Sequence, residues 1–153
     1  MPGEVWFYHL TRRDAAQTLL ALLPRCLDAG WRVAVRAPDE DRLRSLDEAL
    51  WRGPSDAFMP HGIAGGPHDA HQPVLLTTGA AANAPDVVMT LDGAALAPDE
   101  ARALTRACVI FDGGDGAALT RAREQWRALT GAGLPARYWS EESGKWEEKA
   151  RSD

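Results

Sequence analysis

Short apolar runs alternate along the chain with longer segments in which apolar residues recur at helical spacing. Runs of aliphatic and aromatic residues bounded by turn residues are typical of buried strands, and such runs occupy residues 4–10, 31–36, 74–78, 87–91, 107–111 and 134–139. Between them the pattern predicts helices that begin near Asp14, Asp39 and Pro98, and one that spans residues 116–130. The alternation predicts a single-domain, Rossmann-like three-layer α/β sandwich with a mainly parallel sheet.

The pattern is least regular after the second predicted helix. The apolar residues of that helix recur on one face: Leu43, Leu46, Leu50 and Trp51. Residues 54–73 then contain so many glycines and prolines that we predict a long irregular loop, interrupted at most by a brief strand at Phe58. Because the chain from Ser140 onward is mostly charged, we predict an α/β domain over residues 1–140 and a charged C-terminal tail over residues 141–153.

Composition and charge narrow the classes of function. The 153 residues suffice for one hydrophobic core, and a net charge of −5 argues against a surface that binds nucleic acid or anionic lipid broadly. Any anion site must therefore be local. The apolar runs are shorter than the roughly 18 residues that a membrane-spanning helix needs, so we predict a cytoplasmic protein. Cys26 and Cys108 both lie in apolar segments, which favours two buried free thiols over a disulfide.

The Gly-rich turn at residues 112–116 (DGGDG) links a predicted strand to a predicted helix, where phosphates commonly bind in this kind of fold. The chain has no Lys-Ser or Lys-Thr after these glycines and no GxGxxG after its first strand, and the aspartates of the turn would repel phosphate. We therefore predict a tight turn that caps the helix. A nucleotide-binding enzyme remains the alternative function.

Three histidines in the irregular loop, His61, His68 and His71, could form a metal site together with Asp69. Their spacing fits no helical ligand pair, and the loop lacks a nearby cysteine, so we predict solvated histidines and no metal. The sequence contains no local Ser/His/Asp or Cys/His signature either. We predict no cofactor and no catalytic residue.

The predicted helix over residues 116–130 carries the local positive charge. Its apolar arc consists of Leu119, Ala122, Trp126 and Leu129. Arg123 and Arg127 lie on one flank of this arc, and Arg121 points elsewhere. Residues 121–137 together have a net charge of +3. Two arginines one turn apart beside a tryptophan suit an acidic peptide that ends in a hydrophobic residue. The alternative is an ordinary amphipathic helix with solvated arginines and a core tryptophan.

Several stretches spread over the chain resemble the chi subunit of bacterial DNA polymerase III, an accessory subunit of the clamp-loader assembly. The residues that carry the resemblance are Phe7 and Tyr8, LDEALW (46–51), FMPH (58–61), Ile63 to Gly65, Pro73 and Val74, AREQWR (122–127), Gly133, and Trp146 with Glu147. The resemblance implies a Rossmann-like fold without a catalytic site of its own.

The resemblance also implies two protein contacts. Family members bind the acidic, Phe-terminated C-terminal tail of single-stranded-DNA-binding protein, and some bind the small psi subunit of the clamp loader. By matching positions, Arg123 and Arg127 would pair with the tail or its terminal carboxylate, Trp126 would line the peptide pocket, and Arg121 and Arg137 would be additional contacts. The psi-facing surface would include Trp51, Phe58, Pro60 and His61. DNA would be reached only indirectly.

Overall fold

The computed structural model describes residues 3–52 and 60–152. In these ranges, the elements in chain order are β1 (Glu4–Leu10), α1 (Ala15–Asp28), β2 (Val33–Arg36), α2 (Glu40–Trp51), β3 (Gly62–Ile63), the 3-10 turn η1 (Asp69–His71), β4 (Val74–Thr77), β5 (Val87–Leu91), α3 (Pro98–Ala103), β6 (Arg106–Asp112), α4 (Gly116–Gly131), β7 (Ala136–Ser140) and β8 (Glu147–Ser152). The other predicted strands and helices are present, with ends that differ by one to a few residues, while the brief strand expected at Phe58 lies outside the described residues.

All described strands join one sheet in the order β3-β4-β2-β5-β6-β1-β7-β8. Neighbouring strands are parallel, apart from the antiparallel pair β7–β8 at one edge. Parallel neighbours require crossover connections, and the helices supply them. The sheet is therefore mainly parallel, which confirms the fold class expected from the sequence.

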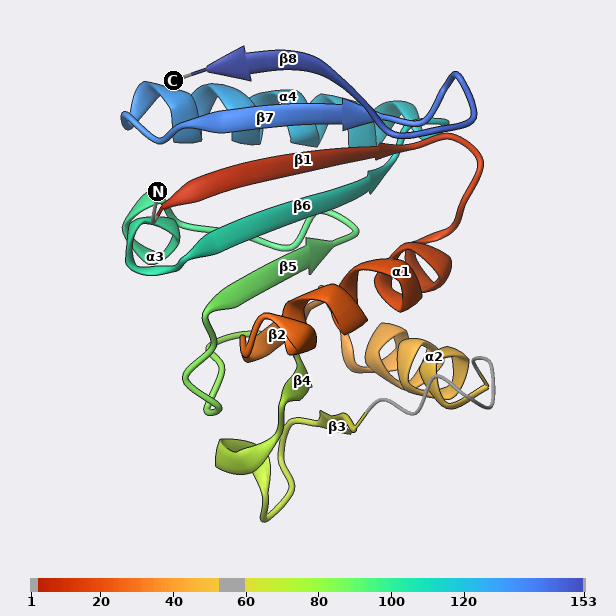
Figure 1. The fold of residues 1–153 in the computed structure, drawn as a ribbon, viewed down its shortest axis with the longest axis vertical. Coiled ribbons are helices and arrows are strands. Elements are labelled where there is room, and N and C mark those ends of the chain that lie inside the picture. Colours follow the sequence, from red (N-terminus) through yellow and green to blue (C-terminus); the bar gives the residue numbers. More distant parts are fainter. Residues whose placement is uncertain (1–2, 53–59, 153) are drawn as a thin grey trace.

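Helices cover both faces of the sheet (Figure 1), with α1 and α2 in front in this view and α3 and α4 behind. The alternation of side chains along β1 shows the two layers, since Tyr8 and Leu10 join the cluster packed by α1 and α2. Val5 and Phe7 join the cluster packed by α3 and α4. A strand with apolar residues on both faces is what burial between two helical layers requires.

The structure differs from the predictions for the end of α2, and it does not describe the strand predicted after it. Leu43, Leu46 and Leu50 are buried as predicted, but Trp51, assigned to the same face, is 54% exposed. Trp51 follows Leu50 by 100° of helical rotation at the end of α2, so it turns away from the core. The strand expected at Phe58 lies outside the described residues, and the remainder of the predicted loop contains β3 and η1.

The stretch expected to be a charged tail, residues 141–153, contains β8, which extends the sheet beside β7. Both cysteines are buried free thiols, as predicted. Burial raises the pKa of the Cys108 thiol to about 12, so this group stays protonated and unreactive near neutral pH. None of the helices within the described ranges is long and apolar enough to cross a bilayer.

Candidate functional site: a basic groove between α4 and β8

The turn between β6 and α4 determines where α4 begins. The Asp112 carboxylate accepts a hydrogen bond from the backbone N–H two residues further on, at 2.9 Å. Asp115 caps the helix and accepts hydrogen bonds from the backbone N–H groups of Ala117 and Ala118. Both carboxylates of the turn thus serve its own backbone, which confirms the predicted N-capped turn and places negative charge where a bound phosphate would lie.

An aromatic cluster supports the outer side of α4. Ala122 and Leu129 are buried against the sheet, and Trp126 is half-buried on the same side of the helix. The Trp126 ring contacts the buried Phe7 of β1, with 5.3 Å between ring centroids, and Tyr138 of β7, with 6.1 Å; both contacts are edge-to-face. Such packing holds the Trp126 ring in one orientation while part of it stays accessible.

This cluster forms the floor of a groove with a volume of about 460 Å³. We call it the α4–β8 groove, and it is lined by Arg123, Trp126, Arg127, Tyr138, Lys149 and Ala150. The two arginines come from one flank of α4, as helical periodicity predicts, and the lysine and alanine come from β8 at the sheet edge. Figure 1 shows α4 and β8 side by side along this edge.

The cations of the groove differ in their present partners. Within the part of the chain that the structure describes, neither Arg123 nor Arg127 takes part in an ion pair. Lys149 Nζ lies 3.3 Å from a carboxylate oxygen of Glu147 on its own strand. The groove therefore presents two exposed guanidinium groups beside an aromatic floor, an arrangement that can bind carboxylates and an apolar side chain together.

Tyr138 supplies a neutral polar group to the floor. Burial raises the pKa of its hydroxyl, and the nearby Arg123 guanidinium acts in the opposite direction without cancelling the effect of burial. The hydroxyl oxygen lies 2.6 Å from Nδ1 of His9, which ties the end of β7 to β1. The ring of Tyr138 is thus held in place for contacts with a ligand.

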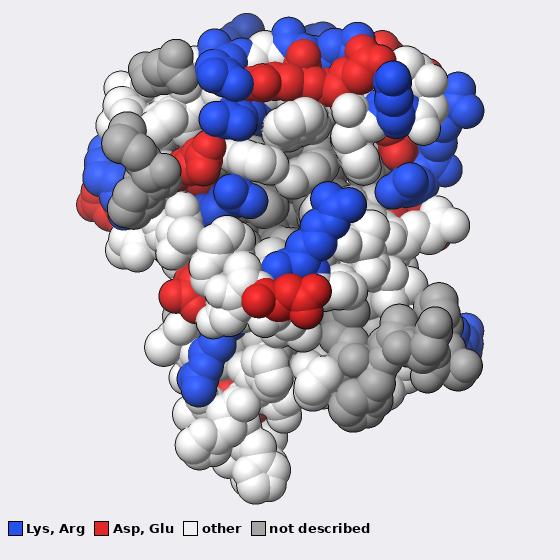
Figure 2. All heavy atoms as spheres, in the orientation of Figure 1, with Lys and Arg blue, Asp and Glu red and all other residues white. Residues whose placement is uncertain are grey.

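The structure separates the other two predicted tail contacts from this groove. Arg121 lies on the opposite flank of α4 and lines a different hollow, of about 360 Å³, beside Gly93. Arg137 neighbours Tyr138 on β7, so its side chain points to the opposite face of the sheet, where Arg137 Nε is 3.4 Å from a carboxylate oxygen of Glu4. On the face of the molecule that Figure 2 shows, basic and acidic side chains are interspersed.

Sequence reasoning missed Tyr138, Lys149 and Ala150. Alternation along the predicted strand at residues 134–139 could have placed Tyr138 on the face of α4, because it is two residues from the buried Ala136. Lys149 and Ala150 had no such signal, since β8 is almost entirely charged. Pairing between Ala150 and Tyr138, next to an irregularity in the β7–β8 register, brings these residues to the groove.

Three of the expected psi-facing residues, Trp51, Pro60 and His61, lie near the edge of the sheet opposite the groove. The exposed Trp51 ring stacks on the buried His61 ring, with 4.3 Å between centroids and 34° between planes. His61 Nε2 lies 3.1 Å from Oδ1 of Asp47, which is on the same helix as Trp51. Pro60 is exposed next to them, whereas Phe58 lies outside the described residues. The Trp51 side chain thus contacts His61 and remains more than half exposed.

The loop that was considered as a metal site uses its acidic side chain internally. The Asp69 carboxylate accepts hydrogen bonds from the backbone N–H groups of Gly65 and Gly66, at 2.8 and 3.0 Å. His61 is buried under Trp51, while His68 and His71 are exposed on the loop. Within residues 3–52 and 60–152, no three potential ligands converge on one point.

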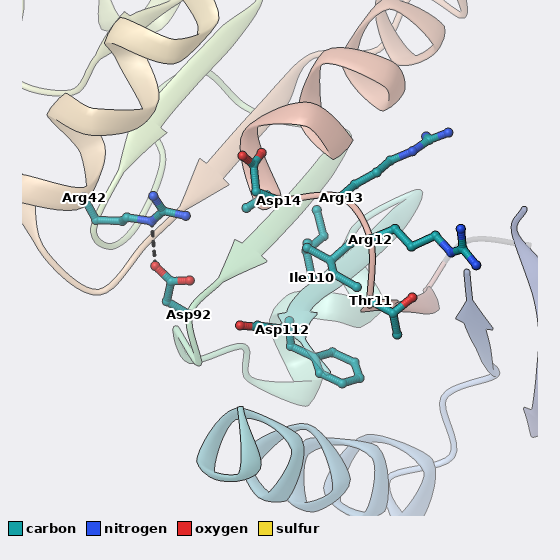
Figure 3. Close-up of a pocket in the computed structure, with 11 residues that line it drawn as sticks. Thr11, Arg12, Arg13, Asp14, Arg42, Asp92, Ile110 and Asp112 are labelled. Atoms are coloured by element: carbon teal, nitrogen blue, oxygen red, sulfur yellow. Dashed lines mark hydrogen bonds and ion pairs between the residues drawn. The ribbon is translucent and has the colours of Figure 1, made fainter. Parts of the chain in front are cut away.

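A second hollow, of about 330 Å³, lies at the carboxyl ends of β1 and β6, where nucleotides bind in many α/β folds (Figure 3). Its walls include Asp92 and Asp112, and Arg42 is already paired with Asp92, with 2.7 Å between Nε and Oδ2. In Figure 3 the side chains of Arg12 and Arg13 extend away from the hollow. The charges that face this space therefore do not favour a phosphate.

Comparisons with known proteins identify the family to which the chain belongs. A family model described as "DNA polymerase III chi subunit, HolC" matches residues 2–137. The DNA polymerase III subunit chi of Escherichia coli (strain K12) is 46% identical over 37 residues, which cover 24% of this chain and 25% of that protein. The aligned stretch thus spans about a quarter of the relative. Because the family model covers most of the chain, this protein belongs to the family of DNA polymerase III chi subunits.

Proposed function

We propose that this protein is a non-catalytic, cytoplasmic connector of the replication machinery, which links the clamp loader to single-stranded-DNA-binding protein by binding the acidic C-terminal tail of the latter. The observation that supports this most directly is the α4–β8 groove, where two exposed guanidinium groups flank a fixed aromatic floor. The binding site for the tail is this groove.

The chemistry of such a tail matches the groove in two respects. Arg123 and Arg127 lie one helical turn apart, so that one can bind the terminal carboxylate while the other binds an acidic side chain of the peptide. The terminal phenyl ring then packs against Trp126 and Tyr138, with Ala150 leaving room because its side chain is small. DNA is reached through the partner, which accounts for a net charge of −5 on a protein of DNA replication.

The alternative function, a nucleotide-binding enzyme, is supported less well. Both aspartates and arginines line the hollow that usually holds a phosphate, but Arg42 is paired with Asp92, and the side chains of Arg12 and Arg13 extend away from the hollow (Figure 3). The Gly-rich turn uses both of its carboxylates on its own backbone. A phosphate there would meet negative charge at close range. A nucleotide titration by calorimetry distinguishes the two proposals, since we expect no heat of binding.

Binding of a synthetic acidic peptide that ends in Phe tests the proposal. We expect affinity to fall steeply as salt rises from about 0.05 to 0.5 M, because exposed ion pairs are screened over a Debye length of about 10 Å or less. Converting the terminal carboxylate of the peptide to an amide removes one partner of the arginines and should weaken binding about 10-fold. Fluorescence anisotropy of a labelled peptide measures both effects. Affinity that changes with neither salt nor amidation would contradict the proposal.

We propose that the surface around Trp51, Pro60 and His61 binds a clamp-loader component, which is the psi subunit where one is present. An exposed, rigidly stacked indole is the kind of residue that dominates the energy of protein interfaces. Trp51→Ala should therefore weaken capture of the clamp loader by about 30-fold, which corresponds to a hot-spot loss of about 2 kcal/mol. Surface plasmon resonance with the immobilised variant measures this.

The control for Trp51→Ala is Arg44→Ala, a change of an exposed residue on the same helix. We expect Arg44→Ala to bind the clamp loader like the wild type. The free energy of unfolding of Trp51→Ala should lie within about 1 kcal/mol of the wild-type value, because more than half of the side chain is already exposed. Equal capture by both variants would exclude Trp51 from the interface.

A further inference from the structure

The loop that follows β1 directs three consecutive backbone N–H groups to a single oxygen atom. Thr11, Arg12 and Arg13 donate hydrogen bonds to Oε1 of Glu141 at 3.0, 2.8 and 2.8 Å. The second carboxylate oxygen of Glu141 lies 3.7 Å from Nε of Arg13. One carboxylate thus receives the backbone N–H groups of all three loop residues.

The environment of this carboxylate is that of a bound ligand rather than a surface side chain. Glu141 is only 3% exposed, although it directly follows β7 in a charged stretch of the chain. Burial by itself would raise the pKa of the Glu141 carboxyl, but the backbone hydrogen bonds from Arg13, Arg12 and Thr11 outweigh burial and hold the pKa below its usual value. The group is therefore a buried, ionised carboxylate that accepts three backbone hydrogen bonds at one oxygen and has an ion-pair contact at the other.

The position of loop 11–13 in the fold is equally specific. The loop leaves the carboxyl end of β1, a central strand of the parallel sheet, and leads to the first turn of α1. Successive backbone N–H groups that converge in a loop of this kind form a concave anion site, and in α/β folds oxyanions of ligands bind at this edge of the sheet. The N-terminus of α1 itself is occupied by its own capping box of Asp14 and Gln17.

We propose that loop 11–13 is an oxyanion-binding site whose ligand is the carboxylate of Glu141 from the same chain. The internal carboxylate closes the site to free phosphate or carboxylate, and it fastens the segment between β7 and β8 to β1. The site can bind oxyanions of different kinds, because its donors are backbone N–H groups, which contact an oxygen atom and not the rest of the ligand.

The proposal predicts that removal of the internal carboxylate opens the site to an external one. Glu141→Ala should melt about 10 °C below the wild type, because three hydrogen bonds to a charged group are lost in a protein of this size. Inorganic phosphate, compared with sodium chloride at equal ionic strength, should restore at least about half of that loss by binding the native state. Saturable shifts of the Thr11, Arg12 and Arg13 amide resonances should accompany the restoration.

Two further variants control for simpler explanations. Glu142→Ala changes the exposed neighbour of Glu141. Among the described residues, the Glu142 side chain makes no hydrogen bond or ion pair with loop 11–13, and only its backbone carbonyl accepts one, from Arg12. This variant should melt like the wild type, and phosphate should not change its melting temperature. Glu141→Gln keeps an oxygen acceptor without the charge, so it should melt between the wild type and Glu141→Ala.

Three results would overturn the proposal. One is phosphate-induced shifts of the loop 11–13 amides in the wild type equal to those in Glu141→Ala, since the site would then be open. Another is a melting temperature of Glu141→Gln equal to that of the wild type, since the loop would not recognise charge. The third is a Glu141→Ala variant that phosphate neither stabilises nor, if it is unfolded in chloride, refolds.

Discussion

Reversing the charge of both groove arginines, by Arg123→Glu and Arg127→Glu together, should weaken binding of an acidic, Phe-terminated peptide by about 100-fold or more. Each arginine is exposed and has no ion pair within the described residues, so its charge is available to the peptide carboxylates. Loss of one charge-assisted hydrogen bond costs about 1.5–3 kcal/mol, and a new glutamate adds repulsion. Fluorescence anisotropy with a labelled peptide measures the change.

Arg121→Glu is the matched control for each single reversal. It makes the same change of charge on the same helix, but Arg121 lines the hollow beside Gly93 on the opposite flank. We expect Arg123→Glu or Arg127→Glu alone to weaken binding about 10-fold, and Arg121→Glu to weaken it no more than about 2-fold through long-range charge. Equal losses for all three variants would show that the peptide responds to net charge rather than to the groove.

Truncation of the groove floor by Trp126→Ala should reduce peptide affinity by about 30-fold or more, because buried aromatic anchors contribute about 2 kcal/mol or more at interfaces. The same change should lower the free energy of unfolding by about 2 kcal/mol, since Trp126 is half-buried and packs on Phe7 and Tyr138. Peptide titration and urea unfolding of the same preparation separate the two effects.

Trp139→Ala provides the control for stability. Trp139 is also half-buried and lies next to Tyr138 on β7, but it faces the other side of the sheet, where its ring packs on Trp6 with 5.4 Å between centroids. We expect a comparable loss of stability with peptide affinity within about 2-fold of the wild type. Trp126→Phe, which keeps an aromatic floor, should recover part of the affinity. If Trp139→Ala weakened binding as much as Trp126→Ala, the effect would be one of stability.

The basic edge of α4 could be predicted because it is a local property of the helix. Arg123, Trp126 and Arg127 lie within two helical turns, and periodicity alone places the arginines beside the tryptophan. The same kind of reasoning could have placed Arg137 on the opposite face of the sheet from Tyr138, since the two residues alternate along their strand. Helical spacing placed Trp51 on the apolar face of its helix, and the family resemblance placed it on the psi-facing surface, because an indole at the end of a helix is compatible with either environment. Only the tertiary structure shows that more than half of the side chain is exposed.

The order of short apolar runs and amphipathic segments determined the α/β class, because a buried parallel sheet requires strands that are apolar on both faces and helices between them. The local spacing of charge predicted that a site for an acidic peptide would lie along α4. Tertiary structure decided the remainder through contacts between residues far apart in the chain. Pairing with β7 turned a charged C-terminal stretch into β8 and brought Lys149 to the groove, and Glu141 reached the loop at residues 11–13. Such contacts leave no periodic pattern, because they join residues of different elements: Ala150 pairs with Tyr138 of the neighbouring strand, and Glu141 lies 128 to 130 residues after the loop residues that it contacts.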